Sequence, residues 1–319
     1  MIKKPVAVVS TKKILVTESS DESLMTGLTS LGYLCTYLPG ISESEVQQQI
    51  HEYEGLIVAT RIIVNKQLLE SASNLKFVAR AGSGMENIDI ETARALNITC
   101  INSPEGNANS VGEHAMAFLL AFYHNLIRSN DEVQQLKWLV EENRVQELEG
   151  RTIGIIGYGN TGKAFARKLH PFSMRVLAYD KYLKNYADKF AEEASMEQLF
   201  EEAEIVSLHI PLTQESLWLV DRHFLQQFRK KIFFINTSRG RLVLHEALLN
   251  QIKESKMMGA ALDVYDNEKF ETHTTEERRV LRELLNTGKV IITPHIAGKS
   301  YEAKKKIADV LLAKIASLG

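Results

Sequence analysis

The sequence lacks most of the features that mark secreted, membrane-spanning or nucleic-acid-binding proteins. Its 319 residues include only two cysteines and six prolines, and no apolar run approaches the roughly 20 residues that span a bilayer. The 38 basic and 40 acidic residues give a formal net charge of −2, so the charge balance favours neither nucleic acid nor an anionic membrane as a partner. We therefore expect neither kind of partner.

The cysteines and the N-terminal residues favour a cytoplasmic location. Cys35 lies in "YLCTYL" and Cys100 in "NITCIN", which are apolar, strand-like settings typical of buried, reduced thiols. Their spacing supports neither a disulfide nor a metal site, and we expect no metal. The opening "MIKKPVAVVSTKK" returns to charged residues too soon for a signal peptide, so we expect none.

Short β-rich runs alternate with amphipathic segments along most of the chain. The first series predicts strands at residues 13–19, 33–38, 55–60, 76–82 and 97–103. The second series begins near residue 152 and predicts strands at "TIGIIGYG", "RVLAYD", "EIVSLHI", "KIFFINTS", "MMGAALDV" and "VIITPH". This alternation favours two α/β units, each a parallel sheet covered by helices on both faces.

A long helical stretch is predicted between the two series, from Ser110 to about Trp138. Asn109 or Ser110 can cap its start, and Glu113 follows Ser110 at the spacing of a capping box. His114 falls in the first turn, where it either packs structurally or contributes to a site. The final helical segment, "SYEAKKKIADVLLAKIAS", is expected to return to the first unit and complete it, which makes that domain discontinuous.

A glycine-rich turn opens the second unit. It reads "GYGNTG", follows the apolar strand at 152–156 and begins a helix at about 160–169, the context that a dinucleotide-binding turn requires. The first glycine permits the tight turn, the second lets the backbone approach a pyrophosphate, and the third lets helix and strand pack closely. The predicted cofactor-binding residues of this turn are Gly157, Tyr158, Gly159, Asn160, Thr161 and Gly162.

The strand that follows this helix ends in an acidic residue. Asp180 lies 18 residues after Gly162, and an acid at this position accepts hydrogen bonds from the adenosine ribose and repels a 2′-phosphate. The residue therefore favours NAD over NADP, although Lys181 next to it carries the opposite charge.

Three further predicted strands of the second unit are each followed by charged or titratable residues. "FFINTSRGRLV" places Arg239 after one strand, "GAALDVYDNEK" places Asp263 and Glu268 after another, and "VIITPH" places His295 after a third. Because active sites of open α/β sheets lie at the carboxyl ends of the strands, we expect the arginine, the glutamate and the histidine to converge.

Seven ordered stretches form one pattern along essentially the whole chain: "RAGSGMENID", "SPEGNANSVGEHA", "GIIGYGNTG", "VSLHIPLT", "INTSRG", "GAALDV" and "TPH". Together they resemble the D-isomer-specific 2-hydroxyacid dehydrogenase family, in particular its phosphoglycerate-dehydrogenase-like members. The resemblance implies a flavodoxin-like substrate domain (1–108 and 294–319), an NAD-binding Rossmann domain (109–293) and a cleft between them. It implies NAD-dependent hydride transfer between the nicotinamide and a small 2-hydroxy or 2-oxo acid, with 3-phosphoglycerate in serine biosynthesis as the leading substrate.

The same resemblance assigns roles to individual residues. His295 would be the acid/base, Glu268 would pair with its imidazole, and Arg239 would clamp the substrate carboxylate. Further cofactor contacts are implied for Asn107, Val111, His209, Pro211, Thr237 and Asp263. The glycine loop would bind the substrate carboxylate through the backbone of Gly82, Ser83 and Gly84.

A phosphorylated substrate would also need a cationic site. Arg61 and Arg80 lie at strand ends of the first unit and are the candidates for it. Ala59 stands where the family often has arginine, which weakens this interpretation. Other departures are Lys269, in place of a proline after Glu268, and Leu244 and His245, in place of two acids; His245 is expected at a helix start rather than as a base.

Two alternatives and one partner complete the predictions. The substrate could be an unphosphorylated acid such as glyoxylate or hydroxypyruvate, or the protein could sense NAD without turnover, as corepressors related to this family do. The resemblance also implies a homodimer formed through the cofactor domain. The residues expected at its interface are Ala117, Leu120, Ala121, His124 and Trp138.

Overall fold

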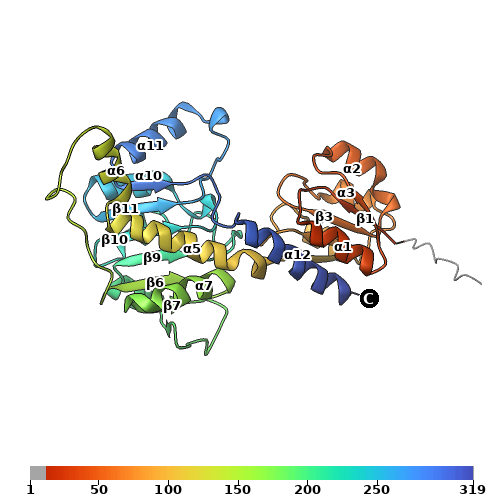
Figure 1. The fold of residues 1–319 in the computed structure, drawn as a ribbon, viewed down its shortest axis with the longest axis horizontal. Coiled ribbons are helices and arrows are strands. Elements are labelled where there is room, and N and C mark those ends of the chain that lie inside the picture. The colour runs from red at the N-terminus through yellow and green to blue at the C-terminus, as the bar shows by residue number, and fades with distance from the viewer. Residues whose placement is uncertain (1–11, 319) are drawn as a thin grey trace, which may run out of the picture. The chain divides into compact units, whose positions relative to one another are not determined.

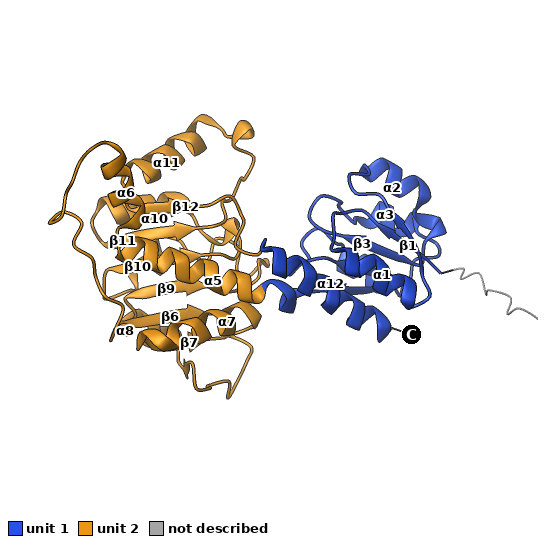
Figure 2. Cartoon of the chain, in the orientation of Figure 1, with its two compact units in different colours: residues 1–107, 299–319 blue, residues 108–298 orange. Residues whose placement is uncertain are grey.

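The computed structural model describes residues 12–318, so most of the N-terminal segment considered above for a signal peptide lies outside the described residues. The chain divides into two compact units (Figure 2). Unit 1 comprises residues 1–107 and 299–319, and unit 2 comprises residues 108–298. Among the described residues, no helix has both the length and the apolar character needed to cross a bilayer.

Unit 1 contains a five-stranded parallel sheet in the order β2-β1-β3-β4-β5 (Figure 1). Its strands are β1 (Lys13–Val16), β2 (Leu34–Tyr37), β3 (Gly55–Val58), β4 (Phe77–Arg80) and β5 (Thr99–Asn102). The predicted strands are confirmed, each shorter than expected. Since every neighbouring pair is parallel, all the carboxyl ends meet at one edge, and the strand order is flavodoxin-like.

The helices of unit 1 cover both faces of this sheet. They are α1 (Glu22–Ser30), α2 (Glu43–Gln49), α3 (Lys66–Ser71), α4 (Ile90–Ala95) and α12 (Tyr301–Ala316). Alternate residues of β1 point to opposite faces, so Leu15 packs with α2, α3 and α4 while Ile14 packs with α1 and α12. Gly27 of α1 allows α12 to approach closely, because a Cβ there would lie 2.4 Å from Leu312.

Unit 2 contains a seven-stranded parallel sheet in the order β12-β11-β10-β9-β6-β7-β8 (Figure 1). Its strands are β6 (Thr152–Ile156), β7 (Arg175–Tyr179), β8 (Glu192–Glu193), β9 (Ile205–Leu208), β10 (Ile232–Asn236), β11 (Met257–Leu262) and β12 (Val290–Ile292). The six predicted strands are confirmed; β8 was not predicted, because its two residues show no periodicity. The chain builds outward from β6 and then crosses back to β9, which creates the switch point where doubly wound sheets bind ligands.

The helices of unit 2 differ from the predicted ones in one place. They are α5 (Pro104–Tyr123), which enters from unit 1, α6 (Leu126–Gln134), α7 (Asn160–Leu169), α8 (Met196–Glu202), α9 (Arg222–Gln226), α10 (His245–Lys253) and α11 (Thr275–Asn286). The single helix expected from Ser110 to Trp138 is wrong. Asn125 has a left-handed φ of 49°, which ends one helix and starts the next.

The start of this helix was also placed too late. α5 begins at a proline, whose fixed φ and missing N–H suit the first turn of a helix. Ser110 lies within α5 and does not cap it; its hydroxyl donates to the carbonyl of Ala297 at 2.6 Å. Val111, implied as a neighbour of the nicotinamide, is buried in the same helix.

Candidate active site

Arg239, Glu268 and His295 all lie at one edge of the sheet of unit 2. Arg239 follows β10, Glu268 follows β11 and His295 follows β12, and these three strands are neighbours in the sheet. The structure therefore brings the arginine, the glutamate and the histidine to the same edge, as parallel strands require.

His295 and Glu268 form a direct pair. Nδ1 of His295 lies 2.9 Å and 3.0 Å from the two carboxylate oxygens of Glu268. This contact holds the proton of the ring on Nδ1 and leaves Nε2 as the nitrogen that can exchange a proton with a ligand. The side chains of His295 and Glu268 are 38% and 46% exposed, so a small molecule can reach the pair.

The surroundings of Glu268 keep its carboxyl group ionised. Partial burial is the largest single effect and acts to raise its pKa, whereas the hydrogen bond and the charge of His295 act to lower it. The backbone of Tyr265 and the charge of Arg239 act in the same direction, so the pKa of Glu268 is lowered overall. Glu268 is therefore an acceptor for the imidazole at neutral pH.

The turn that carries Arg239 packs tightly against the segment that leads to Glu268. Asn236 Nδ2 donates to the carbonyl of Arg239 at 2.9 Å. Gly240 leaves no room for a side chain, because a Cβ there would lie 2.0 Å from backbone atoms of Tyr265. This packing thus fixes the position of the backbone that carries Arg239 relative to the segment that leads to Glu268.

Asp263 holds the turn on which His295 lies. His295 has a left-handed φ of 56°, a conformation that costs a non-glycine residue roughly 1–2 kcal/mol. The carbonyl of Asp263 accepts from the His295 N–H at 2.8 Å, and its carboxylate accepts from the N–H groups of Ile296 at 2.9 Å and Ala297 at 2.8 Å. Asp263 is 1% exposed. Its contact with the nicotinamide stays a prediction.

These bonds also explain where unit 2 ends. The resemblance implies that residues 294–319 belong to the first domain, whereas the compact division places 294–298 in unit 2. The segment stays with unit 2 because Asp263 binds its backbone at three successive residues.

Two further residues are linked to Asp263 by hydrogen bonds: Thr293, for which the sequence predicts no role, and His114, for which it allows either a packing role or a role in a site. Thr293 donates its hydroxyl proton to the carboxylate of Asp263 at 2.5 Å. His114 Nε2 lies 3.0 Å from the same hydroxyl oxygen. Burial lowers the pKa of His114, and the charge of Asp263 opposes this only in part. The neutral imidazole therefore donates to Thr293. The only sign of this role in the sequence is the histidine of "SVGEHA", four residues after Ser110.

The glycine turn after β6 has the backbone geometry of a pyrophosphate site. Gly157 has a φ of 95°, and a Cβ there would lie 2.4 Å from the carbonyl oxygen of His209. A Cβ on Gly162 would lie 2.1 Å from the carbonyl oxygen of Gly157, whereas a Cβ on Gly159 would meet no atom within 4 Å. Two of the glycines are thus required by the fold, and the third faces open space at the start of α7, where Asn160 is the first helical residue.

Asp180 reaches back to this turn. Its carboxylate accepts from the N–H groups of Tyr158 at 2.9 Å, Tyr182 at 2.9 Å and Leu183 at 3.1 Å. Partial burial acts to raise its pKa, but these backbone donors outweigh it and the pKa is lowered. The side chain of Tyr158 is buried and donates to Asp188 at 2.9 Å, so Tyr158 offers only its backbone to a ligand.

The remaining predicted cofactor residues of unit 2 differ in what they can offer. His209 Nε2 lies 2.9 Å from Ser207 Oγ, and its Nδ1 lies 3.3 Å from Thr161 Oγ1. Burial lowers the pKa of His209 to about 3, so its imidazole is a neutral core group. Pro211 is exposed. Among the described residues, the buried hydroxyl of Thr237 has no hydrogen-bond partner, and it can bind a ligand.

The glycine loop of unit 1 follows β4 and is tied to the segment after β5. The N–H of Gly82 donates to Ser103 Oγ at 2.9 Å. The hydroxyl of Ser83 donates to Asn107 Oδ1 at 2.8 Å, which places Asn107 with this loop in unit 1. Within residues 12–318, the N–H groups of Ser83 and Gly84 donate to no protein acceptor, so both can bind an anion.

The two arginines considered for a phosphate are engaged by protein groups. Arg61 donates to the carbonyl of Thr17 at 2.8 Å and to that of Ile41, and its Nε lies 3.5 Å from the carboxylate of Glu18. Arg80 is 8% exposed and donates to the carbonyl of the next residue at 3.0 Å. Arg61 therefore connects the segments that contain Thr17 and Ile41, and the buried Arg80 binds the backbone at the start of the glycine loop.

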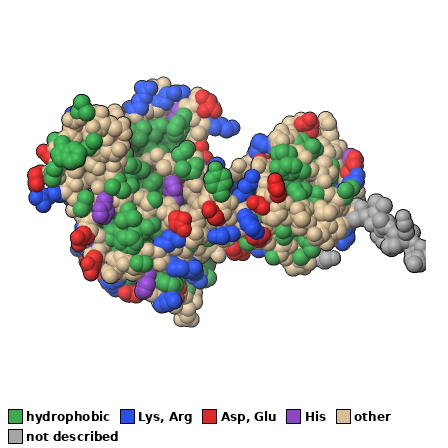
Figure 3. Space-filling model, in the orientation of Figure 1, with side chains coloured by type: hydrophobic (Ala, Val, Ile, Leu, Met, Phe, Trp, Pro, Cys, Tyr) green, Lys and Arg blue, Asp and Glu red, His purple; other side chains and the backbone are tan. Residues whose placement is uncertain are grey.

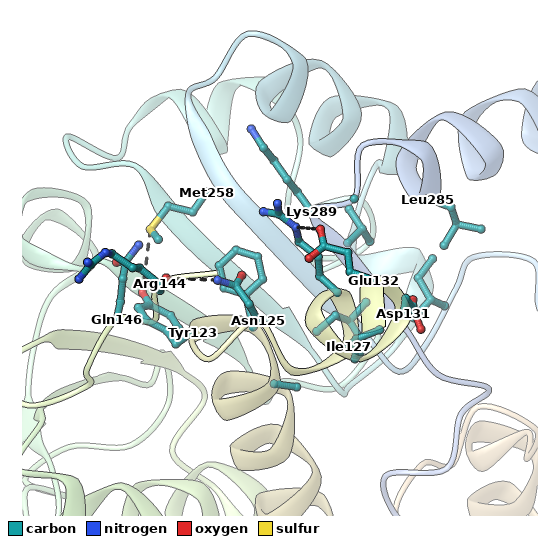
Figure 4. Close-up of a pocket in the computed structure, with 17 residues that line it drawn as sticks. Tyr123, Asn125, Ile127, Asp131, Glu132, Arg144, Gln146, Met258, Leu285 and Lys289 are labelled. Carbon is teal, nitrogen blue, oxygen red and sulfur yellow. Dashed lines mark hydrogen bonds and ion pairs between the residues drawn. The ribbon is translucent and has the colours of Figure 1, made fainter. Parts of the chain in front are cut away.

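A pocket of about 730 Å³ lies elsewhere in unit 2 (Figure 4). It is lined by the end of α5, by α6, by Arg144 and Gln146, by Met258 of β11, by Leu285 of α11 and by residues 288–292. No residue of the glycine turn or of the Arg239, Glu268 and His295 group lines it. In the described part of the chain, no group of three or more histidine, cysteine or acidic residues could hold a metal ion.

Comparisons with known proteins identify the family of the chain. The family model described as D-isomer specific 2-hydroxyacid dehydrogenase, NAD binding domain, matches residues 116–297. A hydroxypyruvate reductase of Thermotoga maritima is 33% identical over 275 residues, which are 86% of this chain and 88% of the relative. A D-3-phosphoglycerate dehydrogenase of Archaeoglobus fulgidus is 30% identical over 308 residues, which are 96% of this chain but only 57% of that relative.

A solved structure has the same fold over nearly the whole chain. The D-lactate dehydrogenase of Aquifex aeolicus, in complex with NAD and lactic acid, has a TM-score of 0.81 and 26% identity, and the match covers 96% of this chain and 95% of the other. The two parallel sheets predicted from the sequence are therefore the fold of known enzymes.

Proposed function

Since the chain belongs to the D-isomer-specific 2-hydroxyacid dehydrogenase family, we propose that it reduces a small 2-oxo acid to the D-2-hydroxy acid and catalyses the reverse oxidation. It is an NAD-dependent oxidoreductase that acts on CH–OH groups. The observation that carries the proposal is the pairing of His295 Nδ1 with both oxygens of Glu268, at 2.9 Å and 3.0 Å, at the same sheet edge as Arg239. This is the arrangement that a proton donor for a carbonyl oxygen requires.

The glycine turn and its neighbours fit the NAD that the reaction uses. Gly159 leaves open space at the N-terminus of α7 for a pyrophosphate, and the ionised Asp180 suits the ribose hydroxyls. The buried hydroxyl of Thr237, which has no protein partner among the described residues, suits a polar group of the same ligand. When bound, the nicotinamide supplies or accepts the hydride at C2 of the substrate.

His295 moves the proton. Its Nδ1–H is held by Glu268, and Nε2 gives its proton to the carbonyl oxygen of the substrate during reduction and takes it back during oxidation. Glu268 keeps the ring in one orientation and stabilises the imidazolium that donates. A preorganised contact of this kind contributes about 3 kcal/mol to lowering a barrier.

The carboxylate of the substrate needs donors of its own. We assign Arg239 to it, because a planar guanidinium can bind a carboxylate through two parallel hydrogen bonds and also polarise a carbonyl. In unit 1, the N–H groups of Ser83 and Gly84, for which the described residues provide no acceptor, suit an anion such as a carboxylate.

The group on C3 of the substrate decides which acid is used. A phosphate there needs an accessible cation, and the guanidinium of Arg61 already binds two carbonyl groups and faces Glu18. Glu18 adds negative charge where a phosphate would need positive charge. We therefore favour an unphosphorylated acid such as hydroxypyruvate or glyoxylate. 3-Phosphoglycerate, the substrate of serine biosynthesis, is the second candidate, which the named A. fulgidus relative supports.

A substrate panel separates these possibilities. Nicotinamide absorbance is followed with glyoxylate, hydroxypyruvate, pyruvate and 3-phosphohydroxypyruvate. We expect the highest kcat/KM for an unphosphorylated acid, and we expect Glu18→Gln to increase the small activity on 3-phosphohydroxypyruvate. A preference for 3-phosphohydroxypyruvate that disappears in Arg61→Ala would instead identify the phosphorylated substrate. Absence of turnover with every acid would contradict the proposed function.

We also propose that the protein forms a homodimer through unit 2. Hydrophobic side chains gather on the surface over α6 and the segment after it (Figure 3), where Leu136 is 96% exposed and Trp138 is 81% exposed. On α5, Ala117 is exposed and Leu120 is half-buried. Isolated exposed apolar residues are ordinary, but a contiguous group of this kind is typical of an interface.

The oligomeric state tests this second proposal. Light scattering of the wild-type chain after gel filtration is expected to give twice the mass of 36.0 kDa. Trp138→Lys is expected to shift the mass toward the monomer, whereas Tyr301→Lys, at a residue that is 94% exposed in unit 1, should leave it unchanged. A wild-type monomer at micromolar concentration would contradict the proposal.

A further inference from the structure

Four rings form a cluster: three belong to residues 265–273, the segment that includes Glu268, and the fourth is that of His245. His245 stacks on Tyr265 with ring centroids 3.9 Å apart, and Tyr265 in turn faces His273 at 5.9 Å. Phe270 completes the cluster at 4.9 Å from His273. His245, His273 and Tyr265 are each buried, whereas Phe270 is 48% exposed, so three of the four rings form a packed core and the fourth lies at its edge.

The cluster connects two of the segments that form the candidate active site. His245 is the first residue of α10, and the chain reaches it directly from the turn of Arg239. Tyr265 begins the segment that ends at Glu268, and its backbone contributes to the lowered pKa of that carboxyl group. The stack of His245 on Tyr265 thus joins the arginine segment to the glutamate segment by side chains, in addition to the close backbone contact at Gly240.

His245 is an unusual residue for this place. Among the described residues, neither of its ring nitrogens has a hydrogen-bond partner, and Nδ1 lies 3.6 Å from a carboxylate oxygen of Asp266. Two titratable groups contact its ring: Asp266 faces Nδ1 and Tyr265 stacks on it. Burial lowers the pKa of His245 to about 4, and Asp266 opposes this only in part, so the ring is neutral at neutral pH and acts as a flat packing group.

We propose that His245 is a positioning residue for the proposed reaction: its ring, stacked on Tyr265, fixes the segment that presents Glu268 and thereby sets the orientation of His295. Only the expected effect of His245 on turnover rests on the proposed function; its effect on the orientation of His295 does not. A misplacement of about 1 Å at a catalytic group can reduce turnover about a hundredfold. Loss of the stack that holds the segment of Glu268 is therefore expected to lower turnover measurably.

Two variants of His245 separate positioning from simple stability. His245→Ala removes the stack, and His245→Phe keeps a flat ring of similar size against Tyr265. We expect His245→Ala to lower kcat about tenfold and to shift the pH profile of kcat/KM, while KM for NADH stays near the wild-type value. His245→Phe should restore most of kcat and the wild-type pH profile. Thermal unfolding of both variants shows whether each is folded at the assay temperature.

A spectroscopic measurement makes the test independent of turnover. In protein labelled at the histidine rings, NMR at neutral pH records the chemical shifts of the ring nitrogens of His295 in the wild type and in both variants. We expect His245→Ala to change the shift of Nδ1, because its partner Glu268 is no longer fixed at 2.9 Å, and His245→Phe to leave it unchanged. Equal Nδ1 shifts in folded His245→Ala and wild-type protein would overturn the proposal, as would equal changes in both variants. If the wild type reduced no 2-oxo acid, the proposed function would fail while the Nδ1 shift still decided the role of His245.

Discussion

The backbone N–H of His295 donates to the carbonyl of Asp263 at 2.8 Å, and the carboxylate of Asp263 accepts from the next two backbone N–H groups at 2.9 Å and 2.8 Å. One buried residue therefore holds a turn whose central histidine has an unfavourable φ of 56°. Without these acceptors, the turn would relax and the imidazole would leave Glu268. Asp263 is for this reason as important to the proposed chemistry as the residues that would touch the substrate.

Asp263→Asn should separate positioning from cofactor binding. The variant replaces one acceptor oxygen by an amide NH₂, which then faces backbone donors. We expect the free energy of unfolding to fall by about 1–3 kcal/mol and kcat to fall about ten- to a hundredfold, with NADH affinity little changed. Asp309→Asn, at an exposed acid of α12, is the matched control. Wild-type kcat in Asp263→Asn would show that the turn does not depend on this carboxylate.

Gly159→Ala and Gly162→Ala should fail in different ways. A methyl group on Gly159 meets no protein atom within 4 Å, whereas one on Gly162 would lie 2.1 Å from a carbonyl oxygen. We therefore expect Gly159→Ala to fold normally and bind NADH at least tenfold more weakly, by about 1.4 kcal/mol. Gly162→Ala should instead lose thermal stability. Nicotinamide fluorescence measures the NADH affinity, and calorimetry measures the thermal stability. Wild-type NADH affinity in Gly159→Ala would show that the pyrophosphate does not bind at this turn.

Asp180→Ala should narrow the preference for NADH over NADPH. The ionised carboxylate of Asp180 repels a 2′-phosphate and accepts from ribose hydroxyls. Removing it leaves Lys163 and Lys181 nearby, and Lys163 is one of the charges that lower the pKa of Asp180. The ratio of kcat/KM for the two cofactors is the measurement. An unchanged ratio would mean that another residue selects the cofactor.

Acid should destabilise the protein through its buried histidines. Burial lowers the pKa of His209 to about 3 and that of His245 to about 4, from an ordinary value of 6.5. Below pH 6.5 the unfolded chain binds protons at these residues and the folded chain does not, so the free energy of unfolding falls as the pH decreases. The loss is about 1.4 kcal/mol per pH unit for each histidine, until about pH 4 for His245 and about pH 3 for His209.

His245→Phe isolates one of these two contributions. In urea titrations between neutral pH and about pH 5, the variant should lose stability with a slope smaller by one proton. Above pH 6.5, the pH dependence of the two proteins should be the same. Equal slopes for the variant and the wild type in the acidic range would mean that His245 is already protonated in the folded state.

The fold could be predicted from the sequence because its signals are periodic and local. Buried parallel strands are continuous apolar runs, so the strands containing Leu15 and Ile155 were visible without any contact information. The glycine turn was recognisable because a strand precedes it and a helix follows it. The residues after β10, β11 and β12 were expected at one edge, because parallel strands end on the same side.

The parts that could not be predicted depend on contacts between distant residues. The break at Asn125 has no proline or glycine to mark it. The role of Ser110 depends on Ala297, which lies 187 residues away. The contacts of Arg61 with the carbonyl groups of Thr17 and Ile41 also join residues that are far apart in the sequence. Because the sequence does not show these contacts, an arginine at a strand end suggested a phosphate site that the structure does not favour.

The turnover of His295→Gln tests the central claim most directly. Glutamine keeps a polar side chain of similar length but cannot donate a proton from a charged ring. We predict that NADH affinity stays within about threefold of the wild type, a difference below 1 kcal/mol, while kcat for the best 2-oxo acid falls about a thousandfold. A kcat within tenfold of the wild type would contradict the assignment of His295 as the proton donor and, with it, the account given above.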